Sequence, residues 1–123
     1  MKVFVTEPEK LDKINPQICL RICKVVNLNA EILIGNCSEF DEIALEILFI
    51  LEYPKVTVYE TGSKDSLGYP IVFCNPNIGS YPAQDIAMSR AADYMLAVYD
   101  GKSPRVAANL KRMPANRIRI ITV

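Results

Sequence analysis

The sequence YMLAVYDGKSP at residues 94–104 joins a continuous apolar run to the start of a helix. Residues 94–99 carry no charge, which is typical of a strand that is buried on both faces of a parallel sheet. Residues 100–102 form a tight connection, and Ser103 followed by Pro104 predicts a helix N-cap and first helical position. This stretch therefore predicts a βα unit, the repeating element of parallel α/β folds.

The same alternation of strand and helix signals extends over the rest of the chain. Strands are predicted over residues 2–5, 32–34, 56–59, 94–99 and 117–121, and helices over 16–26, 39–51, 82–92 and 104–113. Residues 71–73 are a candidate for a further short strand within the irregular segment 61–80. The alternation predicts a three-layer, Rossmann-like α/β fold with about five mainly parallel strands. No linker or repeat divides the chain, so residues 1–123 are expected to form a single domain.

Composition excludes several function classes. The 123 residues are 50% hydrophobic and 23% charged, the balance of an ordinary soluble globular domain. The chain contains no histidine, which excludes Ser-His-Asp and Cys-His catalysis and any metal site with a histidine ligand. A formal net charge of zero predicts no binding to nucleic acid or to an anionic membrane. The four cysteines lack CxxC spacing, so no metal site is predicted. The sequence has neither a signal-peptide pattern nor a membrane-spanning one, which predicts a cytoplasmic protein.

Three segments that follow predicted strands are the candidate ligand-binding positions. In an open parallel sheet, ligands bind beyond the carboxyl ends of the strands. We therefore expect a small-molecule site lined by Thr6 after the first strand, by Gly35, Asn36, Cys37 and Ser38 after the second, and by Asp100, Gly101, Lys102 and Ser103 after the fourth.

The segment from Asp100 to Ser103 is the most informative of the three. Free amides at a helix N-terminus favour an anion, Lys102 adds a positive charge, and Asp100 offers an acceptor for ribose or a base. This arrangement suits a nucleotide or another phosphorylated small molecule. The same residues also make a good turn followed by an N-cap, and this structural interpretation needs no ligand.

Two interpretations also apply after the second strand. The backbone of residues 35–38 can bind a phosphate or a ribose, and Asp41 either contacts the ligand or completes a capping box with Ser38. Cys37 is the only cysteine placed at a strand end. Either a reactive thiol or an inert buried one fits that position.

Enzymatic chemistry would depend on carboxylates. No GxGxxG or GxxxxGK[ST] motif occurs, so a dinucleotide is not expected and no cofactor is predicted. Paired carboxylates can cleave glycosidic bonds, and Asp41, Asp85 and Asp100 are the candidate catalytic residues.

Positive charge is concentrated at the end of the sequence. Residues 102–123 contain no acidic side chain but six basic ones, namely Lys102, Arg105, Lys111, Arg112, Arg117 and Arg119. Such a segment either lies beside an anionic ligand or partner, or forms a solvated face with cations near a helix C-terminus.

Several segments together resemble the SLOG superfamily, small bacterial Rossmann-like domains thought to bind nucleotide-derived ligands. These segments are MKVFV at residues 1–5, ILIGNCSEFD at 32–41, YPKVTVY at 53–59, QDIAMSRAADY at 84–94 and YDGKS at 99–103. The resemblance covers nearly the whole chain and implies the strand order 3-2-1-4-5 and a nucleotide-like ligand. The chain departs from the family pattern at residues 6–8, where TEP replaces a glycine/serine turn, and at residues 104–106, where PRV follows DGKS.

Three hypotheses for the function follow. The first is a domain that binds or senses a nucleotide-like anion. The second is an enzyme that cleaves an N-glycosidic bond in nucleosides or nucleotides. The third is a protein-interaction module that has lost its pocket, which would show as side chains filling the space between the first and fourth strands. A homo-oligomer is also expected from a chain this short and hydrophobic.

Overall fold

The computed structural model describes residues 1–8, 16–35, 39–60, 67–73 and 81–123. In chain order the elements are β1 (Lys2–Thr6), α1 (Pro16–Asn27), β2 (Glu31–Gly35), α2 (Glu39–Ile50), β3 (Val56–Glu60), β4 (Ile71–Phe73), α3 (Tyr81–Ala91), β5 (Tyr94–Tyr99), α4 (Pro104–Leu110), the 3-10 helix η2 (Ala115–Arg117) and β6 (Ile118–Thr122). The predicted alternation is confirmed, and the candidate strand over residues 71–73 is formed as β4.

The six strands form one parallel sheet in the order β4-β3-β2-β1-β5-β6. This is the predicted order 3-2-1-4-5 with the short β4 added outside β3, so the predicted Rossmann-like fold is confirmed. The central strand β1 pairs with both neighbours, since Phe4 lies opposite Leu33 of β2 and Met95 of β5. The middle of β1, residues 3–5, is apolar and buried because helices cover both faces of the sheet.

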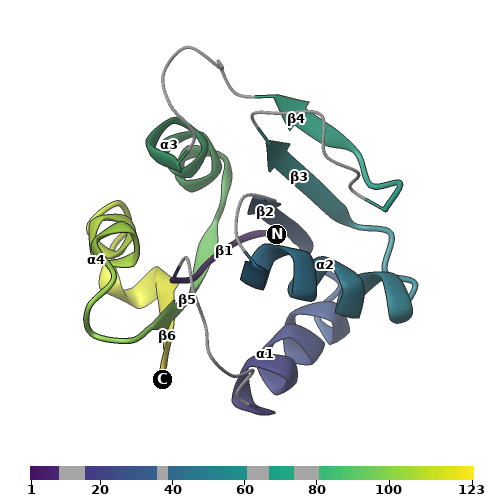
Figure 1. The fold of residues 1–123 in the computed structure, drawn as a ribbon, viewed down its shortest axis with the longest axis horizontal. Coiled ribbons are helices and arrows are strands. Elements are labelled where there is room, and N and C mark those ends of the chain that lie inside the picture. Colours follow the sequence, from purple (N-terminus) through teal and green to yellow (C-terminus); the bar gives the residue numbers. More distant parts are fainter. Residues whose placement is uncertain (9–15, 36–38, 61–66, 74–80) are drawn as a thin grey trace.

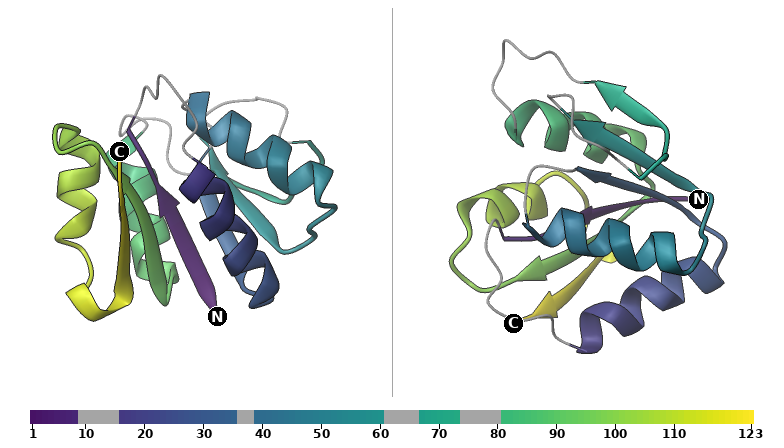
Figure 2. Two further views of the ribbon diagram at one scale, coloured as in Figure 1. Left: turned by 90° about the horizontal axis from the view of Figure 1, so that it is seen from below. Right: turned by 45° about the vertical axis from the view of Figure 1, so that its right-hand side comes forward.

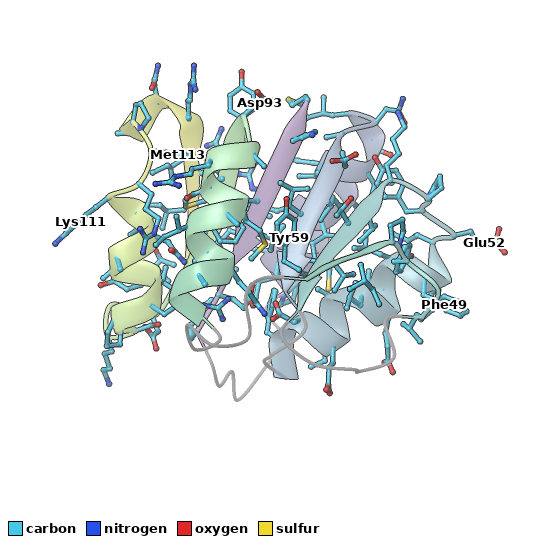
Figure 3. The ribbon with its side chains drawn as sticks, turned by 90° about the horizontal axis from the view of Figure 1, so that it is seen from above. Phe49, Glu52, Tyr59, Asp93, Lys111 and Met113 are labelled. Atoms are coloured by element: carbon cyan, nitrogen blue, oxygen red, sulfur yellow. The ribbon has the colours of Figure 1, made fainter. Side chains whose placement is uncertain are left out.

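The helices form the two outer layers of the fold. Figures 1 and 2 show α1 and α2 on one face of the sheet and α3 and α4 on the other. Side chains alternate between the faces along a strand, so Val3 and Val5 join the core under α1 and α2 while Phe4 joins the core under α3 and α4. Figure 3 shows Tyr59 between α3 and the sheet, where it belongs to the second core.

Helix α4 is shorter than predicted. It ends at Leu110 rather than continuing to Pro114. After Leu110 the backbone changes from α-helical to 3-10-type hydrogen bonds. The amide of Lys111 donates to the carbonyl of Ala108, and the amide of Arg112 donates to that of Asn109. The predicted N-caps Asn15 and Ser38 lie outside the described residues.

Because all strands are parallel, the sheet has two chemically distinct edges. The strands end at one of them, here named the carboxyl edge, and begin at the other, the amino edge. Figure 2 shows the N-terminus at the amino edge and the C-terminus at the carboxyl edge. Within the part of the chain that the structure describes, no helix is long and apolar enough to cross a membrane.

Candidate functional site

Polar side chains from four elements meet beneath the carboxyl edge and form what we call the carboxyl-edge cluster. The cluster consists of Thr6 and Glu7 at and after the end of β1, Asp41 in the first turn of α2, Gln84 and Asp85 in α3, and Arg105 and Asn109 in α4. All are at most 2% exposed except Arg105, whose side chain is 7% exposed. Polar groups are seldom buried so completely unless hydrogen bonds or ion pairs hold them.

The strongest contact in the cluster joins α3 to α4. The Nε and Nη2 atoms of Arg105 donate to Oδ2 and Oδ1 of Asp85 at 2.9 and 3.0 Å. This two-pronged geometry matches the planar guanidinium fork to the carboxylate and gives a strong, directional ion pair. Asp85 is therefore held as an acceptor by the protein itself.

Asn109 extends this network to the central strand. Its Nδ2 atom lies 2.8 Å from Oγ1 of Thr6 and 2.9 Å from Oδ2 of Asp85, and donates to both. Its Oδ1 atom accepts from Nε of Arg112 at 3.0 Å. The amide thus uses both its donor and its acceptor side, which fixes α4 against the end of β1.

Glu7 and Asp41 bring further negative charge to the same place. Oε1 of Glu7 lies 4.0 Å from Nη1 of Arg105. Burial alone would lower the pKa of Arg105, but the hydrogen bond to Asp85 and the charges of Glu7, Asp85 and Asp41 outweigh it, so the pKa lies above its ordinary value. The cluster holds three carboxyl groups and one guanidinium, and its balance is acidic.

Gly35 ends β2 directly against this cluster. A Cβ atom at this position would lie 3.1 Å from Oε1 of Gln84 and 3.2 Å from Oδ2 of Asp41. Both distances are tighter than ordinary van der Waals contacts, so the glycine lets two polar side chains approach the backbone. The carboxylate of Asp41 thus lies close to Gly35, and the role of residues 35–38 in binding a phosphate or a ribose stays a prediction.

The segment from Asp100 to Ser103 differs from the predicted anion site. Oδ1 of Asp100 accepts hydrogen bonds from the amides of Lys102 at 2.9 Å and Ser103 at 2.8 Å, which lowers the pKa of Asp100. Oγ of Ser103 accepts from the amide of Val106 at 3.4 Å, as expected for an N-cap.

Two of the amides on which the anion hypothesis relies, those of Lys102 and Ser103, are thus used inside the turn, and the assignment of residues 100–103 to a ligand site stays a prediction. Both hydrogen bonds of the turn use Oδ1 of Asp100, and the expectation that Asp100 accepts from a ribose or base stays a prediction. Gly101 supplies the turn with a backbone φ of +78°, a conformation that glycine adopts readily. The segment is a turn and helix cap.

The predicted site residues divide into three groups. Thr6, Gly35, Asp41 and Asp85 come together at the carboxyl-edge cluster, whereas residues 100–103 make the turn that starts α4. Asn36, Cys37 and Ser38 lie outside the described residues. Sequence interpretation missed Gln84, Arg105 and Asn109. The spacing of Arg105 and Asn109 was the available signal, because residues four apart share one face of a helix.

Comparison of the chain with protein-family models, with curated proteins and with solved structures gave no match. Among the described residues, no group of three or more cysteine, aspartate or glutamate side chains is arranged to hold a metal ion.

Proposed function

We propose that this chain is a small-molecule binding domain whose ligand is a ribose-bearing, nucleotide-like compound, held at the carboxyl edge through its hydroxyl groups. The observation that carries the proposal is the carboxyl-edge cluster, where Glu7, Asp41 and Asp85 are all buried beside the ends of β1 and β2. Burying three carboxyl groups with one guanidinium is costly for a fold, and such arrangements concentrate at functional sites.

The chemistry of the cluster favours the hydroxyl groups of such a ligand over its phosphate. Ionised carboxylates only accept hydrogen bonds, and sugar hydroxyls are donors that they can satisfy. A phosphate would instead meet the negative charges of Glu7 and Asp41, and the amides of Lys102 and Ser103 are occupied by Asp100. The resemblance to the SLOG superfamily agrees with a nucleotide-derived ligand and remains part of the proposal.

A second candidate function has its own supporting observation. Arg105 and Asn109 reach from α4 to Glu7 and Thr6, so the protein's own side chains occupy the space beside the end of β1. A filled space is what the protein-interaction hypothesis requires. Since Glu7 and Asp41 are fully buried, a small ligand must open part of the carboxyl edge to reach them.

Cleavage of an N-glycosidic bond receives less support. Asp85 is held by Arg105 and Asn109, and Asp100 by two backbone amides, so two of the three candidate catalytic carboxylates already serve as structural acceptors. We therefore propose binding without assigning a catalytic step.

Titration calorimetry separates the two candidate functions. We expect adenosine, adenosine monophosphate and ADP-ribose to bind, and inorganic phosphate not to bind at millimolar concentration. The Asp41→Asn variant keeps the shape of the side chain and should lose binding, whereas Asp100→Asn, a carboxylate change in the turn, should not. If no ribose compound binds at millimolar concentration, the binding proposal is wrong and the interaction module is the better candidate.

Two expectations about the protein's setting belong to the same proposal. We propose a cytoplasmic location, which suits the free thiols of Cys19 and Cys23. We also propose that the chain associates with copies of itself, a point taken up in the Discussion.

A further inference from the structure

A pocket of about 410 Å³ lies at the amino edge, at the opposite end of the strands from the carboxyl-edge cluster. It lies between the second half of α1 and the first residues of β1, β5 and β6. Val3 and Leu96 belong to the core on the α1 side of the sheet, and Arg119 lies beside Leu96 in register. Neighbours in register share a face, so Arg119 projects toward α1 as well.

The charged side chains that line this amino-edge pocket are all cationic. Arg21 and Lys24 come from α1, Arg117 is the last residue of η2, and Arg119 lies at the start of β6. No aspartate or glutamate of the described residues lines the pocket, and none forms an ion pair with any of these four cations. Four like charges around one hollow repel each other and create a positive potential that favours an anion.

One acidic side chain close to the pocket, that of Asp93, is engaged elsewhere. Asp93 adjoins the pocket beside Arg117, and its Oδ2 accepts from the backbone amide of Lys2 at 2.8 Å. Figure 3 shows Asp93 at this edge of the sheet. Asp93 thus holds the first residues of β1 through this hydrogen bond, and its side chain does not line the cationic pocket.

The remaining lining is largely apolar and includes Val3, Val25, Leu28 and Leu96. Leu28 is 66% exposed, which leaves an apolar surface open to solvent next to the cations. The volume of the pocket falls within the range of about 300–1,000 Å³ that is usual for small-molecule sites. An extended acidic peptide would need a longer groove than a hollow of this size.

We propose that the amino-edge pocket binds a small organic anion that combines a compact apolar body with a carboxylate, sulfonate or phosphate group. The apolar body packs on Val25, Leu28 and Leu96. The anionic group accepts charge-assisted hydrogen bonds from Arg21 and Lys24 of α1 and from Arg117 and Arg119. This site shares no side chain with the carboxyl-edge cluster and does not depend on the function proposed there.

Fluorescence titration with anilinonaphthalene sulfonate tests the proposal, because this dye carries an aromatic body and one sulfonate. We expect saturable binding at one site, weakened by added salt because the cations are largely exposed. Uncharged phenylnaphthylamine should bind at least about tenfold more weakly, since it lacks the group that accepts charge-assisted hydrogen bonds. Equal affinity for the two dyes, or no saturable binding of the sulfonate, would overturn the proposal.

Matched variants locate the site. Lys24→Gln and Arg119→Gln should each weaken dye binding by about tenfold. Lys111→Gln removes the same charge from a side chain that Figure 3 shows pointing away from the body, and should leave binding unchanged. All three positions are exposed, so folding should be preserved. An equal loss in Lys111→Gln would mean general charge attraction and would overturn the proposal.

Amide chemical shifts in nuclear magnetic resonance spectra give an independent location. Adding the dye should shift the amides of Leu28, Leu96 and Arg119. Shifts confined to Thr6 and Gly35 would place the dye at the carboxyl edge and contradict the proposal. Tighter binding of a glutamate-rich peptide than of the dye would assign the surface to a protein partner, and would likewise overturn it. Binding of adenosine is a separate measurement, so either site can fail alone.

Discussion

Arg105 and Asp85 are 20 residues apart in the sequence, yet their side chains form two parallel hydrogen bonds of 2.9 and 3.0 Å between α4 and α3. Both side chains are buried, and Glu7 and Asn109 contact the same pair. A buried ion pair of this kind adds little stability compared with apolar residues, but removal of one partner leaves an uncompensated charge.

The first prediction concerns the loss of this guanidinium. Arg105→Met should lower the free energy of unfolding by about 3–5 kcal/mol, because it leaves the carboxylates of Asp85 and Glu7 buried without their cation. Urea denaturation measures the change. Lys111→Gln is the control, since an exposed cation outside any such network should change stability by less than about 0.5 kcal/mol.

The double variant Arg105→Met, Asp85→Leu tests the reason for that loss. Replacing both partners by apolar side chains removes the uncompensated charge of Asp85 but leaves that of Glu7, so we expect the double variant to recover about half of the stability lost in the single variant. A double variant less stable than Arg105→Met would show that the pair acts through packing or through Asn109 instead.

The second prediction concerns pH. Hydrogen bonds from the amides of Lys102 and Ser103 hold the pKa of Asp100 below its ordinary value of 3.8. A group whose pKa is lowered by folding stabilises the protein above its unfolded pKa, and this stabilisation is lost as pH falls through the folded pKa. The stability difference between the wild type and Asp100→Ala should therefore be constant near neutrality and shrink below about pH 4.

Thermal unfolding at a series of pH values checks this prediction. Asp93→Ala is a suitable comparison, because Asp93 accepts from a single backbone amide, that of Lys2. A difference for Asp100→Ala that grows on acidification would contradict the assigned role of the carboxylate.

The third prediction separates two glycines. Gly35→Ala should destabilise the protein by about 1–3 kcal/mol, because the new methyl group meets Gln84 and Asp41. Gly101→Ala meets no atom within 4 Å but must hold a φ of +78°, and should cost about 1 kcal/mol. Adding Gln84→Ala should relieve part of the cost at Gly35 and none at Gly101. Urea denaturation of the single and double variants provides the comparison, and equal relief at both positions would contradict the steric explanation.

The fourth prediction concerns self-association. Phe49 and Ile50 in the last turn of α2 and Leu51 directly after it are 55, 77 and 45% exposed, and large apolar side chains exposed at one end of a helix are candidates for protein contacts. Figure 3 shows Phe49 at this end of the molecule. Light scattering should give a mass above 13.8 kDa for the wild type. The Phe49→Ser, Ile50→Ser variant should be a monomer, and a monomeric wild type at high concentration would remove the expected homo-oligomer.

The fold was predictable from the sequence because its signals are local. The uncharged run of residues 94–99 and the Ser103-Pro104 helix start need no information from distant parts of the chain. The turn at Asp100 is also local, because its carboxylate reaches the amides two and three residues ahead. What the sequence alone could not decide was whether those amides serve Asp100 or a ligand, since both uses require the same residues.

The site was less predictable because its contacts are long-range. In the sequence, Arg105 stood out only as part of the PRV that follows DGKS and of the basic segment 102–123, and its partner Asp85 lies on a different helix. The cations of the amino-edge pocket show the same difficulty. Arg117 and Arg119 were visible as part of a basic segment, but only the register of β5 and β6 brings them near Lys24, which is far earlier in the chain.

Strand β1 connects the two ends of the molecule. Val3 lines the amino-edge pocket and Thr6 belongs to the carboxyl-edge cluster, a separation of about 10 Å along the strand. Hydrogen bonds to β2 and β5 on both sides prevent β1 from sliding, so occupancy of one end has no simple mechanical route to the other. If both proposed sites bind ligands, we therefore expect their dissociation constants to be independent, so that selection could retune one site without disturbing the other.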